Sequence, residues 1–144
     1  MTSESRQYGL AYAVFEYRLI CGETEMTESV TLIPAGEVLC TLESLSDGAA
    51  RIVQVRASEG LISVIVLRSG EQCFAYLNRC PHFGSPLSQT DAQLYHGPHE
   101  WLKCNIHYAV FRWSDGQCIK GECEGDALTA VPVLLRDGLV LVGP

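Results

Sequence analysis

Two short segments containing Cys and His are the residues of this chain best suited to chemistry. The first reads Cys80-Pro81-His82 and the second reads Cys104-Asn105-Ile106-His107, with twenty-one residues between His82 and Cys104. Each segment offers one thiolate and one imidazole among residues typical of turns. Such soft and borderline ligands bind metals when a fold brings their two loops together. The spacing therefore predicts a metal centre assembled from both segments.

The distribution of ligand types narrows the choice of metal. Zinc fingers usually take their two cysteines from one segment and their two histidines from another. Here each segment carries one residue of each type, so each iron of a two-iron cluster can take like ligands from opposite loops. Cys80 and Cys104 would then bind one iron, and His82 and His107 the other. A structural zinc site in a binding module is the alternative that these residues leave open.

The stretch from about Val38 to Pro144 resembles the Rieske-type iron–sulfur proteins, most closely the soluble Rieske ferredoxins of ring-hydroxylating dioxygenase systems. Residues 80–87 (CPHFGSPL) match the first cluster loop, and residues 104–107 (CNIH) with Phe111 match the second. Further matches downstream are Asp115-Gly116, Gly121, Leu128 and Val131-Pro132-Val133. The resemblance implies a Rieske 2Fe-2S cluster as cofactor, with Cys80, His82, Cys104 and His107 as its ligands.

Several positions depart from the family pattern. Tyr108 follows the second His, where the family usually has Gly, and Gly121-Glu122 stands where a shielding segment often has Gly-Pro. Ala109 and Phe111 replace the Ser and Tyr whose hydroxyls lie near the cluster in high-potential relatives. Hydrogen bonds to the cluster help to set its reduction potential. We therefore predict a potential at the low end of the family range of roughly −150 to +300 mV.

Composition and charge exclude several functional classes. A chain of 144 residues with 47% hydrophobic and 19% charged residues suits one folded domain rather than a disordered segment. A formal charge of −7 disfavours nucleic acid, which needs clustered Lys and Arg, and favours a basic protein partner. The sequence has neither the pattern of a signal peptide nor an apolar run long enough for a membrane anchor, so we expect a cytoplasmic protein.

The remaining cysteines show no disulfide framework. They are odd in number and irregular in spacing, which indicates buried free thiols. These residues are Cys21, Cys40, Cys73, Cys118 and Cys123. Cys118 and Cys123 follow the second loop, which leaves open a role as alternative ligands. His96 and His99 are expected to be solvated loop residues. Trp101 and Trp113 are expected to be core or cluster-shielding aromatics, with a role in docking as the alternative.

The chain reads as strands and turns, with no sustained helical period. Strands are expected at residues 37–42, 51–56, 61–68 and 71–78, with hairpin turns at Ser69-Gly70 and Arg136-Asp137-Gly138. These signals predict an all-β fold, an antiparallel β barrel or sandwich spanning residues 38–144. A cluster-binding subdomain is inserted at about residues 78–113. Residues 1–37 are expected to form an N-terminal extension, an additional β-hairpin built on alternation from Ala11 to Leu19 and on Ser29–Ile33. A contact with a subunit or partner is the alternative role for this extension.

The resemblance implies an electron carrier rather than an enzyme. Such a ferredoxin passes single electrons from a reductase to an oxygenase. A second function is that of a Rieske small subunit within an oxidoreductase complex, such as a nitrite reductase or an oxygenase component. The chain carries none of the common nucleophile or nucleotide-binding motifs.

Overall fold

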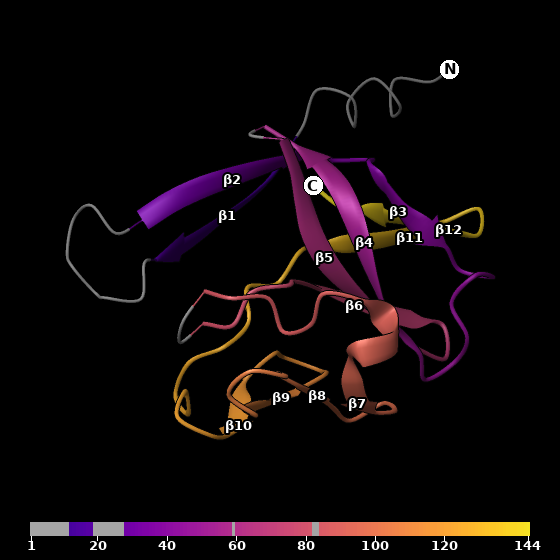
Figure 1. Ribbon diagram of the computed structural model, residues 1–144. Helices are drawn as coiled ribbons and strands as arrows, with labels where there is room; N and C mark the ends of the chain where they lie inside the picture. The colour runs from indigo at the N-terminus through magenta and orange to yellow at the C-terminus, as the bar shows by residue number, and fades with distance from the viewer. Residues whose placement is uncertain (1–11, 19–27, 59, 82–83) are drawn as a thin grey trace.

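The computed structural model describes residues 12–18, 28–58, 60–81 and 84–144, which form four antiparallel sheets (Figure 1). The strands and a short 3-10 helix, η2, follow in chain order: β1 (Tyr12–Arg18), β2 (Glu28–Pro34), β3 (Val38–Thr41), β4 (Ala50–Ala57), β5 (Gly60–Ser69), β6 (Gln72–Leu77), η2 (Asp91–Gln93), β7 (Tyr95–Gly97), β8 (Trp101–Lys103), β9 (Val110–Arg112), β10 (Cys118–Lys120), β11 (Val133–Arg136) and β12 (Leu139–Val142). The prediction of an all-β fold is confirmed.

Strands β4, β5 and β6 form the central sheet. The β5–β6 ladder runs from Val64 opposite Leu77 to Ser69 opposite Gln72, so the two strands meet at a tight turn. Gly70 in that turn has a φ of +66°, a left-handed conformation that glycine adopts without steric cost. A second hairpin joins β11 to β12, and β12 also pairs with β3. These two hairpins lie where turn residues separate apolar runs in the sequence.

Strand β5 is buried on both faces. Val64 and Val66 belong to a core shared with β3 and β12, whereas Ile65 and Leu67 belong to a second core beside the cluster loops. All four side chains are fully inaccessible to solvent. A strand covered on both sides needs apolar residues at every position, which explains the unbroken Val-Ile-Val-Leu run. The central sheet therefore supports both the β body and the candidate site.

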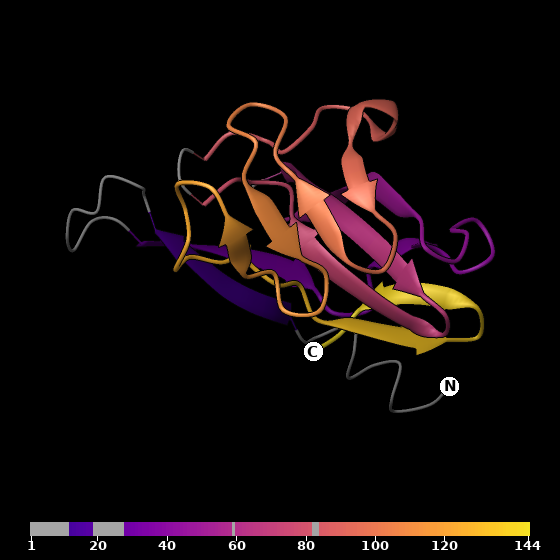
Figure 2. The same cartoon turned by 90° about the horizontal axis from the view of Figure 1, so that it is seen from below.

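The second core is covered by a small sheet with the strand order β10-β9-β8-β7. Figure 2 shows these short strands layered on the central sheet. Tyr76 on β6 donates a hydrogen bond of 2.6 Å from its hydroxyl to the carbonyl of Trp113, which is 1% exposed. Burial, with the nearby Asp115 carboxylate, raises the pKa of Tyr76 to about 12, so the hydroxyl keeps the proton that it donates. This bond joins the two layers.

Strands β1 and β2 pair from Tyr12 opposite Pro34 to Arg18 opposite Glu28. They lie where the alternation in the sequence indicated two strands. Ile33, near the end of β2, is fully buried in the same core as Val64 and Val66, which anchors the hairpin to the body. Among the residues that the structure describes, no helix has the length and apolar character needed to cross a bilayer.

Candidate metal centre

The first loop is closed by the side chain of Asn78, which is 8% exposed. Its amide nitrogen donates to the carbonyl of Ser88 at 2.8 Å and to Ser63 Oγ at 3.1 Å, and its amide oxygen accepts the N–H of Leu87 at 2.8 Å. The two ends of the loop are therefore joined through one side chain. The sequence places Asn78 at the end of a strand and the start of the cluster-binding subdomain, without indicating this role for its side chain. A polar residue between an apolar strand and the Cys80 motif was the available signal for its role.

Cys80 sits in a tight turn inside this loop. Its N–H donates to the carbonyl of Ser85, and its carbonyl accepts the N–H of Gly84, both at 2.7 Å. Gly84 has a φ of +77°, which suits glycine at the point where the chain reverses. The side chain of Cys80 is fully buried. His82, the other ligand predicted in this loop, lies outside the described residues, so its role stays a prediction.

The second loop is the turn of the β8–β9 hairpin. The N–H of Cys104 donates to the carbonyl of Ala109 at 2.8 Å, and the N–H of Tyr108 donates to the carbonyl of Cys104 at 2.9 Å. Closing the turn places Tyr108 at a φ of +62°, where a side chain is strained. This geometry gives a physical reason for glycine to be favoured there. The N–H of Asn105 also donates to the carbonyl of Leu87 at 2.9 Å, which ties the two loops together.

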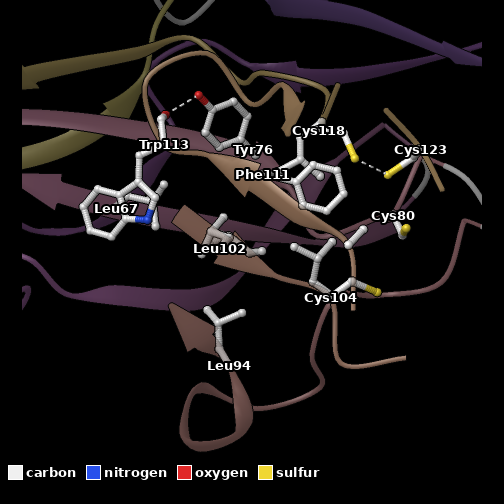
Figure 3. Close-up of a cluster of buried hydrophobic side chains, with 14 residues drawn as sticks. Leu67, Tyr76, Cys80, Leu94, Leu102, Cys104, Phe111, Trp113, Cys118 and Cys123 are labelled. Atoms are coloured by element: carbon white, nitrogen blue, oxygen red, sulfur yellow. Dashed lines mark hydrogen bonds between the residues drawn. The ribbon is translucent and has the colours of Figure 1, made fainter. Parts of the chain in front are cut away.

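Three of the predicted ligands come together between these loops. The ligand atoms of Cys80, Cys104 and His107 all lie within 4.8 Å of one another. The two cysteines are fully buried, whereas His107 is exposed. Figure 3 shows both sulfurs at the same end of the second core, beyond Phe111 and Leu102. The site therefore has an interior side made of sulfur and an outer side that carries an imidazole.

The surroundings of Cys104 favour its ionised form. A hydrogen bond with the Cys80 thiol, together with the backbone N–H groups of His107 and Ile106 and the His107 side chain, lowers the pKa of Cys104 to about 5. These bonds outweigh burial, which acts in the opposite direction. A thiolate is the form of cysteine that binds metals. At neutral pH the second loop therefore presents a ligand that is already deprotonated.

The donor set fits a Rieske cluster as far as the described residues extend. Two buried sulfurs, one of them held as a thiolate, and a solvent-facing imidazole converge from two loops. Ser85 Oγ, in the first loop, is buried and has no hydrogen-bond partner among the residues that the structure describes, so this hydroxyl can donate to a bound group. Ala109 and Phe111 are both buried and carry no hydroxyl near the second loop.

Cys118 and Cys123 lie in the second core but outside the group of three converging ligands. The thiol of Cys123 donates to the sulfur of Cys118 at 2.8 Å. Burial, then the hydrogen bond with Cys118, raises the pKa of Cys123 to about 12, so this residue keeps its proton at neutral pH. This geometry gives no support to the hypothesis that the pair supplies alternative metal ligands. Cys40 and Cys73 are buried free thiols in the other core, and Cys21 lies outside the described residues.

The other histidines lie apart from the metal ligands. His99 is exposed, yet its Nδ1 is 2.8 Å from Ser69 Oγ and its ring lies 5.8 Å from that of Trp113. His96 is half-buried and stacks on the same indole at 6.2 Å. Both therefore help to cover Trp113 rather than being simply solvated. Trp113 is a core residue as expected, and its indole N–H donates to the carbonyl of Trp101 at 2.9 Å.

Solved structures share this fold. The ferredoxin of carbazole 1,9a-dioxygenase from Nocardioides aromaticivorans IC177 matches 76% of this chain and 98% of its own, with a TM-score of 0.58 and 24% identity. A chain from a complex of reduced oxygenase and oxidised ferredoxin in carbazole 1,9a-dioxygenase matches 74% of this chain and 90% of its own, with a TM-score of 0.58 and 24% identity. At such identities the likeness establishes the fold.

Part of a larger protein shares this fold as well. The terminal oxygenase of carbazole 1,9a-dioxygenase from Novosphingobium sp. KA1 matches 74% of this chain with a TM-score of 0.60 and 23% identity, and the chain spans only 29% of that oxygenase. No curated protein sequence matches the chain.

The family model for the Rieske [2Fe-2S] domain matches residues 37–133. The match covers more than half of the chain and includes both loops that carry the predicted ligands. The fold, the convergence of sulfur and imidazole between two loops and this match agree with one another. The chain therefore belongs to the family of Rieske [2Fe-2S] domains, whose cofactor is a cluster of two irons and two sulfides.

Proposed function

We propose that this protein is an electron carrier that takes single electrons from a reductase and passes them to an oxygenase. The observation that carries the proposal is the layout of the site, with Cys80 and Cys104 buried and His107 exposed within the same 4.8 Å group. A Rieske cluster accepts and releases one electron at a time. The exposed imidazole gives that electron a short route to a docked partner, while the buried thiolates are kept from water.

The surface around His107 suits docking. Its neighbours Ile106 and Tyr108 are 52% and 62% exposed, unusual positions for large apolar side chains. An apolar contact ringed by polar groups is common in protein interfaces. The formal charge of −7 would draw a basic partner toward the protein by long-range attraction. The reductase and oxygenase partners are supported by the likeness to ferredoxins of dioxygenase systems.

The proposal assigns the cluster to Cys80, His82, Cys104 and His107. It also keeps the division of the chain expected from the sequence: an extension at residues 1–37, a Rieske domain at residues 38–144 and a cluster-binding subdomain at about residues 78–113. The cytoplasm is the setting proposed for the protein, because its cysteine usage is that of a reducing compartment.

The test is electron paramagnetic resonance of the dithionite-reduced protein, with iron and sulfide analysis of the same sample. We expect two irons and two sulfides per chain and one unpaired electron coupled to imidazole nitrogens. His107→Ala should remove one of the two imidazole couplings or the cluster itself. His99→Ala is the matched control, because His99 is an exposed histidine away from the metal group, and it should leave both unchanged. A colourless protein that contains one zinc would overturn the proposal in favour of a structural zinc module.

A second candidate function is a Rieske subunit within an oxidoreductase complex. The likeness to part of a terminal oxygenase favours it, since the same domain occurs there inside a larger enzyme. Light scattering on the protein as isolated from its native cells separates the two candidates. A carrier is expected to run at the mass of its own chain or a small multiple of it, and a subunit to remain with a large partner.

A further inference from the structure

The Cys118 and Cys123 sulfurs form a second site that the cluster does not use. They lie 2.8 Å apart, and the two residues are 5% and 1% exposed. Non-bonded heavy atoms as small as carbon make their best contact at roughly 3.5–4.0 Å, so this approach is close for two sulfurs. It exceeds the length of a disulfide bond by only about 0.8 Å. Figure 3 shows the two thiols pointing toward each other.

The backbone already holds these two residues in place. The N–H of Cys118 donates to the carbonyl of Asp126, and the N–H of Asp126 donates to the carbonyl of Cys123, both at 2.9 Å. Within residues 119–126, all of which are described, Cys123 is the one buried side chain. An otherwise exposed turn therefore buries one thiol, that of Cys123, and places it against the thiol of Cys118. Bond formation needs a small shift of two side chains rather than a new path for the chain.

The turn between the two cysteines packs on the second cluster loop. Gly121 has a φ of +111°, and a Cβ atom at this position would lie 2.9 Å from Cα of Ala109. The carbonyl of Ala109 in turn accepts the N–H of Cys104. The segment that carries the dithiol is therefore two contacts away from a cluster ligand. Fixing the turn would also fix Ala109, and through it the loop that holds Cys104.

We propose that Cys118 and Cys123 form a reversible disulfide that locks residues 118–126 against the second cluster loop. The oxidant is a peroxide. One thiol attacks the peroxide O–O bond of hydrogen peroxide, becomes a sulfenic acid and releases one water. The second thiol then displaces the sulfenic oxygen, which leaves as the second water while the S–S bond forms. Two electrons pass from the two sulfurs to the peroxide, and a dithiol reductant returns them.

The geometry suggests the order of these steps. The Cys123 thiol donates its proton toward Cys118, whose own thiol faces the carbonyl of Lys120 at 3.4 Å. Cys118 is also the more exposed of the two residues. Cys118 therefore reacts first, and Cys123 completes the bond from the interior.

Peptide mapping of the cluster-loaded protein tests the bond directly. Trypsin cuts after Lys120, which lies between the two cysteines, and so separates residues 113–120 from residues 121–136. The protein is treated with hydrogen peroxide, the peroxide is removed with catalase, and the remaining thiols are alkylated after denaturation. We expect a cross-linked pair of these two peptides that disappears when dithiothreitol is added before alkylation. Recovery of both peptides separately alkylated would overturn the proposal, as would a cross-link to the peptides of Cys80 or Cys104.

Two variants sharpen the result. Cys123→Ser should abolish the cross-link, whereas Cys73→Ser should leave it intact, because Cys73 is a buried free thiol in the other core. If a variant fails to fold, the peptide map of the wild-type protein still tests whether the disulfide forms. A cross-link that persists in Cys123→Ser would contradict the assignment.

The locking effect is read from the cluster. We expect visible absorbance to be lost about threefold more slowly from the disulfide form than from the dithiol form on warming with a chelator, because the closed turn restricts opening of the loop. Cys123→Ser should lose its absorbance at one rate, with or without prior peroxide. Equal rates for the two wild-type forms would overturn the lock. The peptide map does not depend on electron transfer. A negative map would therefore contradict the disulfide without contradicting the proposed function, and loss of the proposed function would leave the map unaffected.

Discussion

The two loops of the metal centre are held in different ways. The first is closed by a side chain, since Asn78 bonds to Leu87 and Ser88 across the mouth of the loop. The second is closed by the backbone of the β8–β9 hairpin and contains the left-handed Tyr108. Closure of the first loop at its ends therefore depends on the identity of one side chain, whereas closure of the second depends on backbone turn geometry. Point substitutions should affect the two loops unequally.

The largest effect is expected for Asn78→Ala in the first loop. The substitution leaves the buried N–H of Leu87 and the carbonyl of Ser88 without their partner, and each such loss costs about 1–3 kcal/mol. We expect the free energy of unfolding to fall by roughly 3 kcal/mol, measured by urea denaturation of the cluster-loaded protein. The matched control in the second loop is Asn105→Ala, which removes one exposed hydrogen bond to Gln93 and should cost about 1 kcal/mol. Equal losses of unfolding free energy in the two variants would contradict the proposed difference between the loops.

A smaller effect is expected on the reduction potential from Ser85→Ala. Ser85 Oγ is buried and has no partner in the described part of the chain, so a hydroxyl there can donate to the bound cluster. Losing a hydrogen bond of about 1 kcal/mol should lower the potential by roughly 40 mV for one electron. Voltammetry measures the shift. Ser88→Ala is the control, because Ser88 Oγ already donates to the carbonyl of Thr90, and it should leave the potential unchanged. A shift in both variants would point to a general change of the loop.

The smallest effect is expected for Tyr108→Gly in the second loop. Glycine adopts a φ of +62° freely, so the variant should be more stable by roughly 0.5–1 kcal/mol despite losing the contact of Tyr108 with Lys103. The shift in the midpoint of thermal unfolding reports the change. Tyr95→Gly is the matched control: Tyr95 is similarly exposed but lies in strand β7, so its replacement should destabilise the protein. A loss of stability in both variants would argue against strain at Tyr108.

The sequence is most informative for the β body. The Val-Ile-Val-Leu run of β5 and the glycine turns after β5 and β11 indicated their strands and hairpins because each follows from a local rule of burial or backbone conformation. The family and its cofactor could be predicted from the two Cys/His loops. The four-residue ligand set stays a prediction, because the structure brings Cys80, Cys104 and His107 together but leaves His82 undescribed.

The cluster-binding segment was harder to anticipate. Strands β7, β8 and β9 have three residues each, too few for alternation to be recognised. Their pairing with β10 extends the small sheet as far as Lys120. The role of Asn78 and the contact of Cys118 with Cys123 depend on tertiary packing, which no local pattern encodes. The positive φ of Tyr108 runs against residue preference, so only comparison with the family could suggest that the position is unusual.

The double-sided burial of β5 limits how the redox site can be transferred between proteins. Ile65 and Leu67 form part of the floor beneath the cluster loops, although they precede those loops in the chain and belong to the central sheet. A graft of residues 78–113 onto another scaffold would leave behind this floor and the Tyr76 bond to Trp113. The cluster-binding segment therefore cannot be transferred by itself. A new host protein must also supply a strand that is buried on both faces, as β5 is.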